Sequence, residues 1–218
     1  MNLLAIDTAT ESCSAALLVN GKVYQRFTVQ ARLHAELILP FIDELLEESE
    51  ISKTQIDGLV VGRGPGAFTG VRIGVAVAQA LALALDLKVV EVSNLIALAY
   101  RAIDELNQQE PFNLVVATDA RMNEVYWTKY QIKGDEIISL TEEHVGKACD
   151  VELADTDYYI GNGFSVYPEL IDCANTHPMP FKTDINSDAK DMLLLVKDQF
   201  KKLAISASNL SPVYLREP

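Results

Sequence analysis

The sequence predicts an α/β protein with two lobes, each built on a mixed sheet flanked by helices. A buried strand and a hairpin open the chain over residues 3–29, and the same order of patterns returns over residues 112–140. Residues 107–111 are polar and end in proline, which is typical of a boundary between lobes. We therefore expect a first lobe over residues 1–107 and a smaller second lobe over residues 108–218, with the final segment packed back on the first.

The first lobe begins with three expected strands. Residues 3–7 are apolar as far as an aspartate and predict a buried strand, and residues 13–19 and 22–29 predict two more. The Asn20-Gly21 pair between the last two strands favours a two-residue hairpin turn, because asparagine and glycine adopt positive φ readily.

Asp7, Thr8 and Thr10 lie where the first strand runs into a turn. Aspartate and threonine commonly cap turns by hydrogen bonding to the nearby backbone. The same groups, delivered by a strand to the mouth of a hairpin, could instead contact a phosphate or Mg²⁺. The residues alone leave both interpretations open.

Residues 35–49 predict a helix that contains Pro40. Its apolar side chains cover about 200° of the circumference, which is about twice the stripe needed to face a single core. This width favours a protein interface on the side that the lobe leaves uncovered.

A glycine-rich turn at residues 62–70 joins a strand at residues 59–61 to an apolar helix that ends at Leu85. Such a turn presents backbone N–H groups at a helix N-terminus and can bind an anion. The residues expected to form this cradle are Gly64, Gly66, Thr69 and Gly70. The turn is not a P-loop, because Phe68 and Thr69 stand where that motif has its G-K-[ST] and no lysine follows the glycines.

The helix after this turn is apolar around almost its whole circumference. Its polar side chains, Arg72 and Gln79, share one narrow stripe. A membrane span would have a similar length, but these two residues, the high alanine content and the preceding strand and turn argue against one. An ordinary buried core helix is the other alternative. A helix of this kind needs cover on both faces, and another subunit could supply the outer layer.

Further elements are expected along the rest of the chain. Ser93 is placed to cap a helix that runs to about Leu106, and residues 135–157 are acidic enough to predict a solvated face and loop. The other predicted elements are strands at residues 88–92, 112–118, 124–132 and 136–140, a strand and glycine-rich turn at residues 158–163, an amphipathic helix at residues 188–203, and an apolar closing segment at residues 212–216.

The formal net charge is −13, and most of it lies in the second half of the chain. Residues 1–100 hold 7 Lys and Arg against 11 Asp and Glu, whereas residues 101–218 hold 11 against 20. Such a surface repels a polyanion, because affinity for nucleic acid rests largely on Lys and Arg. If the protein serves a reaction on nucleic acid, we expect another protein to hold it.

The cysteines and histidines do not form a metal-binding pattern. They are Cys13, Cys149, Cys173, His34, His144 and His177. Their spacing predicts free thiols in a reducing cytoplasm and no zinc site. The N-terminus has no basic segment before its apolar run and meets a charge at Asp7, so neither a signal peptide nor an anchor is expected.

A complete catalytic constellation is missing from the sequence. There is no G-x-S-x-G elbow and no P-loop lysine. Asp7 and Asp119, each at the end of an opening strand, could face one another across a cleft between the lobes, as in actin-like ATPases. This pattern fits an active phosphotransferase or ATPase that uses both aspartates with Mg²⁺ and ATP, and equally a degenerate copy that no longer turns over nucleotide.

Four segments together resemble a known family. They are residues 4–17, the Gly-Pro-Gly-Ala-Phe-Thr-Gly motif within residues 62–74, the Asp-Ala-Arg-Met-Asn-Glu-Val-Tyr-Trp run at residues 119–127, and the closing Pro-Val-Tyr-Leu-Arg at residues 212–216. In this order and spacing they are similar to the TsaB (YeaZ) family of bacterial tRNA threonylcarbamoyladenosine biosynthesis proteins. The resemblance covers both expected lobes.

This resemblance implies an actin-, Hsp70- and sugar-kinase-like fold of the ribonuclease H type. It implies a non-catalytic subunit that binds the paralogous transferase TsaD, with the P-loop ATPase TsaE as a third component. TsaD transfers a threonylcarbamoyl group to an adenosine of tRNA. The resemblance also implies a cytoplasmic protein without a membrane role that contacts tRNA only indirectly, forms a homodimer when alone and requires no cofactor. Nucleotide is expected only in the assembled complex.

The resemblance also bears on the interface and on metal binding. TsaD-like chains carry a metal-binding H-x-x-x-H on the helix that corresponds to the one after Ser93, and residues 93–98 contain no histidine. Neither metal-dependent transfer nor the peptidase activity once ascribed to this superfamily is therefore expected. We expect the partner interface on the two wide apolar helices, at Leu37, Phe41, Leu45, Val75, Ala78 and Ala82.

Overall fold

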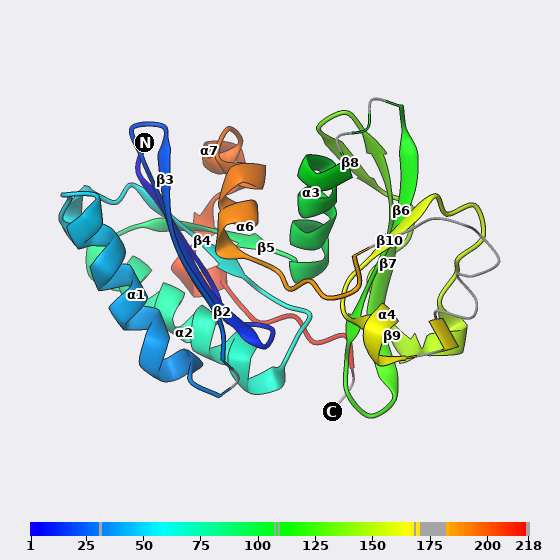
Figure 1. Ribbon diagram of the computed structural model, residues 1–218. Helices are drawn as coiled ribbons and strands as arrows, with labels where there is room; N and C mark the ends of the chain where they lie inside the picture. Colours follow the sequence, from blue (N-terminus) through cyan, green and yellow to red (C-terminus); the bar gives the residue numbers. More distant parts are fainter. Residues whose placement is uncertain (31, 107, 109, 168, 171–181, 217–218) are drawn as a thin grey trace. The chain divides into compact units, whose positions relative to one another are not determined.

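The structure is a computed structural model that describes residues 1–30, 32–106, 108, 110–167, 169–170 and 182–216 (Figure 1). The chain forms two compact units. Unit 1 comprises residues 1–97 and 187–213, and unit 2 comprises residues 98–186 and 214–218.

Unit 1 is built on a six-stranded mixed sheet with the strand order β11-β5-β4-β1-β2-β3. The central strand β1 runs parallel to β4 and antiparallel to β2. The strands are β1 (Leu3–Asp7), β2 (Ser12–Val19), β3 (Lys22–Val29), β4 (Gly58–Gly62), β5 (Lys88–Val92) and β11 (Ile205–Ser206). At the β2–β3 turn, Asn20 and Gly21 both have positive φ, as expected for the predicted hairpin.

Helices cover both faces of this sheet, and β1 is accordingly apolar from Leu3 to Ile6. Leu4 and Ile6 pack towards α1 (His34–Glu48) and α2 (Phe68–Leu85), whereas Leu3 and Ala5 pack towards α6 (Ala189–Val196). Figure 1 shows α1 and α2 on one side of the sheet and α6 on the other. The short helix α7 (Phe200–Leu203) follows α6, so the structure divides the single helix predicted at residues 188–203. Short 3₁₀ turns lie at Lys53–Gln55 and Ala207–Asn209.

Unit 2 holds the second mixed sheet, with the order β10-β6-β7-β8 and β9 paired to β7. Its strands are β6 (Phe112–Asp119), β7 (Glu124–Lys133), β8 (Glu136–Ser139), β9 (His144–Lys147) and β10 (Tyr158–Ile160). The 3₁₀ turn η2 (Ala148–Asp150) and the short helix α4 (Gly163–Val166) follow β9 and β10 respectively. The helix α3 (Asn94–Leu106) begins in unit 1 and continues into unit 2. The acidic segment predicted as a loop therefore contains β9, which the sequence did not reveal.

The central strands of the two sheets share one topology. β6 is antiparallel to β7 and parallel to β10, as β1 is to β2 and β4. Each central strand ends in an aspartate, Asp7 or Asp119. The repeated order of patterns seen in the sequence thus corresponds to a repeated arrangement of strands.

The division of the chain differs from the predicted boundaries. The prediction assigned all of residues 108–218 to the second lobe, with only the end packed back, whereas residues 187–213 lie in unit 1. The reason is that β11 pairs with β5, α6 covers β1, and the Val213 N–H donates to the carbonyl oxygen of Arg63 at 2.9 Å. Unit 1 is therefore assembled from two segments that are distant in sequence.

Candidate functional site

Asp7 lies at the end of β1 and is fully buried, with none of its surface exposed. Its Oδ1 accepts hydrogen bonds from the Ala9 N–H at 3.0 Å and from Asn94 Nδ2 at 2.9 Å. Its Oδ2 accepts from Ser187 Oγ at 2.6 Å and from Asn94 Nδ2 at 3.0 Å. Burial raises the pKa of the Asp7 carboxyl, and these hydrogen bonds together with the charge of His34 oppose the rise.

The same cluster joins the starts of α3 and α6 to the glycine-rich turn and to β2. Asn94 Oδ1 accepts from the Gly64 N–H at 2.9 Å, so the start of α3 is fixed to the glycine-rich turn. Ser12 Oγ donates to the Ser187 carbonyl at 3.1 Å, and Ser14 Oγ accepts from the Ala189 N–H at 2.9 Å, which fixes the start of α6 to β2. Sequence reasoning missed Asn94 and Ser187, because nothing local marks residues 87 and 180 positions away as partners of Asp7.

This arrangement bears on the predicted phosphate or Mg²⁺ contact. Both oxygens of Asp7 point to donors of the chain itself, and the buried carboxylate is out of reach of a ligand in solution. Thr10 Oγ1 is hydrogen-bonded to Ser12 Oγ at 2.8 Å, and the buried His34 donates from Nε2 to the Thr10 carbonyl at 2.7 Å. Asp7 and Thr10 are thus held by groups of unit 1 itself, and their contact with a phosphate or Mg²⁺ stays a prediction.

The glycine-rich turn packs directly on the turn after β1. A Cβ atom on Gly66 would collide with the carbonyl oxygen of Ala9, and one on Gly70 with that of Thr8. The Ala67 N–H donates to the Ala9 carbonyl at 2.7 Å, and Thr8 Oγ1 donates to the Gly70 carbonyl at 2.7 Å. These glycines are therefore required for close backbone contact. Anion binding by the cradle, including the exposed Thr69, stays a prediction without structural support.

The structure corrects part of the predicted interface. Four of the six predicted interface residues form the core between the helices and the unit's own sheet and are at most 3% exposed. They are Leu45, Val75, Ala78 and Ala82. They cannot lie on an outward face. Leu37 and Phe41 are only partly buried, so their contact with a partner stays a prediction.

The outward face of α2 lies on another arc of the helix. Leu83 is 83% exposed and Phe68 is 59% exposed, with the Arg72 guanidinium stacked on the Phe68 ring at 3.4 Å. We use "outward α2 face" for the exposed residues of this helix, which are Phe68, Thr69, Arg72, Ala76, Ala80, Leu83 and Ala84. Although α2 is long and apolar enough to cross a membrane by length and composition alone, it packs against β4 and β1, and 33% of it is buried there. The sheet therefore covers only one side of this apolar helix.

Asp119, at the end of β6, organises a second cluster within unit 2. Its Oδ1 accepts from Tyr167 Oη at 2.6 Å and from the Arg121 N–H at 2.8 Å, and Arg121 Nη1 lies 3.1 Å from Oδ2. Burial and the bond to Asp119 raise the pKa of Tyr167 to about 12. Asp7 and Asp119 belong to different units, so their predicted approach across a cleft stays a prediction.

The turn between β6 and β7 is strained and braced. Three successive residues of this turn have φ near +60°, in the left-handed region that residues other than glycine rarely adopt; they are Arg121, Met122 and Asn123. Arg216 braces the turn from the C-terminal segment: its guanidinium donates to the Ala120 carbonyl at 3.2 Å and pairs with Glu124.

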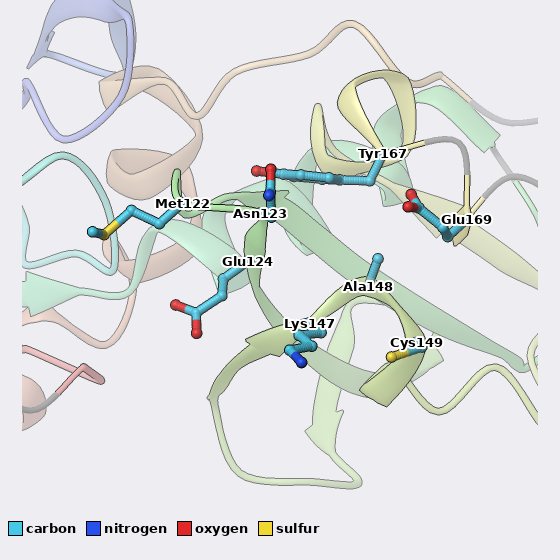
Figure 2. Close-up of a pocket in the computed structure, with 8 residues that line it drawn as sticks. All are labelled: Met122, Asn123, Glu124, Lys147, Ala148, Cys149, Tyr167 and Glu169. Atoms are coloured by element: carbon cyan, nitrogen blue, oxygen red, sulfur yellow. The ribbon is translucent and has the colours of Figure 1, made fainter.

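A pocket of about 500 Å³ adjoins this turn. Figure 2 shows its walls: the turn at residues 122–124, the segment at residues 147–149, and Tyr167 with Glu169. We call it the unit 2 pocket. This pocket could not be predicted from the sequence, because its walls come from three separate segments.

Comparisons with known proteins show the family of this chain. Residues 27–181 match the family model of TsaD, tRNA N6-adenosine threonylcarbamoyltransferase. The tRNA threonylcarbamoyladenosine biosynthesis protein TsaB of Haemophilus influenzae is 39% identical over 99% of this chain and 94% of its own length, and TsaB of Escherichia coli is 35% identical over 99% and 95%. The chain belongs to the TsaB (YeaZ) family. The predicted resemblance is thereby confirmed.

A solved member of the TsaB family has the same fold. YeaZ from Pseudomonas aeruginosa superposes with a TM-score of 0.86 at 35% identity, over 98% of this chain and 100% of that one. The predicted class of two mixed sheets flanked by helices is confirmed by this match and by the topology. The match to the TsaD model is consistent with TsaB and TsaD being related chains.

Proposed function

We propose that this chain is a non-catalytic subunit in the biosynthesis of threonylcarbamoyladenosine in tRNA. Two relatives that match along almost the whole chain carry that biosynthetic role in their names. The observation that carries the more specific role is the outward α2 face, an exposed apolar surface on a helix whose other side is already in the core. A surface of this kind is typical of a protein interface, and TsaD is the proposed partner.

The state of Asp7 supports a role without catalysis. A carboxylate whose oxygens are both held by Asn94 and Ser187 is poorly placed to bind Mg²⁺ or to move a proton to a substrate. Residues 93–98 also lack the histidines that TsaD-like chains use for metal. We propose that this chain requires no cofactor of its own, and that nucleotide is bound only in the assembled complex.

The charge of the chain supports indirect contact with tRNA. A net charge of −13 repels the phosphate backbone, so the partner has to supply the basic surface that holds tRNA. We further propose a cytoplasmic complex with TsaD to which TsaE is added, and a homodimer through the same α2 face when TsaD is absent.

Co-purification with TsaD of the same organism tests this role. Ala80→Arg and Leu83→Asp each place a charge on the outward α2 face, and each is expected to abolish binding of TsaD. Because both positions are exposed, circular dichroism and the unfolding midpoint should stay close to those of the wild type.

The matched control is Ile138→Asp, which puts a charge on an exposed apolar residue of β8 in unit 2. It should bind TsaD normally. Retained binding by both α2 variants would refute the assigned face, and loss of binding in the control would show that any added charge suffices. Ala78→Arg is unsuitable as a test, because Ala78 is fully buried and the substitution would disrupt the core.

A further inference from the structure

The chain passes between the two units three times, and all three passages leave unit 1 beside one hydrogen-bonded cluster. The first passage follows Ala97, the second precedes Ser187 and the third follows Val213. We propose that this cluster, centred on Asp7, is a conformational hub that fastens the three passages to unit 1 and limits the motion of unit 2.

The first two passages are held by the side-chain oxygens of Asp7. Asn94, in the first turn of α3, donates from Nδ2 to both oxygens, at 2.9 and 3.0 Å. Ser187, where the chain returns from unit 2, donates from Oγ to Oδ2 at 2.6 Å. Asn94 Nδ2 also donates to Ser187 Oγ at 2.8 Å, so the anchors of these two passages contact each other.

A single peptide group joins the third passage to the other two. Its N–H, from Gly64, donates to Asn94 Oδ1 at 2.9 Å, and its carbonyl, from Arg63, accepts from the Val213 N–H at 2.9 Å. Gly64 has a φ of +95°, where a residue with a side chain would be strained. The hydrogen bonds therefore connect Ser187 to Val213 by way of Asn94 and this peptide group.

The centre of the hub is buried, so water cannot readily replace its hydrogen bonds. Asp7 and Ser187 have no exposed surface, and Asn94 is 1% exposed. A buried polar group that loses one partner is left unsatisfied unless its neighbours rearrange, and the members of such a network strengthen one another. Loosening one passage is therefore expected to loosen the other two, whereas a purely local role would leave them unchanged.

Amide hydrogen exchange, measured by NMR on the full chain, tests this coupling. Ser187→Ala removes the hydroxyl that bonds to Asp7 and Asn94 at the second passage. The Val213 N–H reports on the third passage. If the passages are coupled, exchange of the Val213 N–H should quicken about fivefold or more in this variant.

The matched control is Thr128→Val. It also removes a fully buried hydroxyl, but this hydroxyl lies in unit 2 and bonds to the Thr141 carbonyl at 3.2 Å. The cost of a lost buried hydrogen bond is thus present in the control without any change in the hub. Exchange of the Val213 N–H should stay as in the wild type.

The motion of unit 2 is measured by electron spin resonance as the distribution of distances between two spin labels. The exposed Cys149 takes the label on unit 2, and Asp43→Cys on α1 takes the label on unit 1. Cys13 is buried, and burial raises its pKa to about 11, so its thiol should react slowly. Cys173→Ser removes the remaining thiol. We expect one narrow distribution, which becomes about twofold broader or more when Ser187→Ala is added.

Both readouts have to change for the proposal to stand. Faster exchange at Val213 together with a broader distribution, in Ser187→Ala but not in Thr128→Val, supports the hub. An unchanged exchange rate, an unchanged width, equal effects of the two variants, or a broad distribution before Ser187→Ala is added would overturn it.

A milder variant keeps the test decisive if Ser187→Ala does not fold. Ser12→Ala retains the Ser187 hydroxyl and removes the hydrogen bond from Ser12 Oγ to the Ser187 carbonyl, 3.1 Å long. It should change the exchange at Val213 and the label distances in the same direction by a smaller factor. No change in either readout would overturn the proposal.

Discussion

A carboxylate can act on a ligand only if one of its oxygens can be reached, and at Asp7 both are occupied. Ser187 supplies the shortest of these hydrogen bonds, 2.6 Å to Oδ2, from a segment that joins unit 1 only after unit 2 has been traversed. Asn94 contributes to both oxygens and connects them to the glycine-rich turn. The aspartate that sequence reasoning offered as a catalytic candidate therefore acts in this structure as the centre of a buried polar cluster.

The buried state of Asp7 predicts a specific dependence of stability on pH. Burial raises its pKa above the ordinary value of 3.8, so the folded chain binds this proton more tightly than the unfolded chain. The stabilising contribution of the proton is complete below pH 3.8 and is lost as the pH rises through the raised pKa of the folded state. The Asp7→Asn variant has no such proton, so its free energy of unfolding lacks this pH-dependent contribution.

Urea unfolding of both proteins at a series of pH values from about 3.5 to 7 measures the effect. As the pH rises, the free energy of unfolding of the wild type should fall relative to that of Asp7→Asn. The comparison between the two proteins cancels the other titrating groups. The assignment of a raised pKa would be contradicted if the difference in free energy of unfolding between the two proteins did not depend on pH. It would also be contradicted if the wild type became more stable relative to Asp7→Asn as the pH rises.

At the level of elements, most strands and helices could be predicted from the sequence, but the solvent-exposed face of α2 could not. Periodicity identifies the inner arc of a helix by contrast between apolar and polar residues. In α2 that contrast is nearly absent, since alanines, valines and leucines occupy both arcs, and so Val75 and Ala78 were placed outward when they lie in the core. Likewise, β9 has only four residues within an acidic segment, too short and too polar for its alternation to be visible.

The glycine-rich turn gives a prediction in which packing opposes helix propensity. Gly70 lies in the first turn of α2, where alanine would by itself favour the helix by up to about 1 kcal/mol. A Cβ atom at this position would collide with the backbone carbonyl of Thr8, which cannot move aside as a flexible side chain can. Gly70→Ala is therefore expected to destabilise unit 1, by roughly 1–3 kcal/mol.

Urea unfolding followed by far-ultraviolet circular dichroism measures this change. The control is Gly134→Ala in the β7–β8 turn, where no atom of the described residues lies within 4 Å of the new Cβ and only the φ of +59° opposes alanine. This control is expected to lose about 1 kcal/mol. If Gly70→Ala proved as stable as the wild type or more so, the close contact between α2 and the turn after β1 would be wrong.

On the scale of the whole molecule, the two units have the same topology of central strands but differ in net charge. The acidic charge is concentrated in unit 2, with 17 acidic against 7 basic residues, and unit 1 is close to balance at 14 against 11. The sequence showed the excess of acid in its second half, but its proposed boundary could not show that residues 187–213, with their four lysines, return to unit 1. That return depends on the pairing of β11 with β5 and on the polar cluster around Asp7, which are contacts between distant parts of the chain.

This distribution predicts that salt stabilises unit 2 more than unit 1. Like charges on a compact unit repel one another, and the repulsion is screened over about 10 Å at 0.1 M salt and about 3 Å at 1 M. Trp127, the single tryptophan, is buried in the core of unit 2 and reports its unfolding by fluorescence. The urea midpoint read from Trp127 should therefore rise between low salt and 0.5 M NaCl, a concentration of the order at which screening is strong. A reporter for unit 1 is Phe27→Trp, at a partly exposed site on β3, in a Trp127→Phe background. Its midpoint should rise less, because unit 1 carries little net charge.

Two outcomes would contradict this prediction. Equal shifts of the urea midpoint at the two reporters would mean that the units unfold together or that salt acts through hydration. A fall in the midpoint at Trp127 would show that attractive ion pairs outweigh repulsion in unit 2.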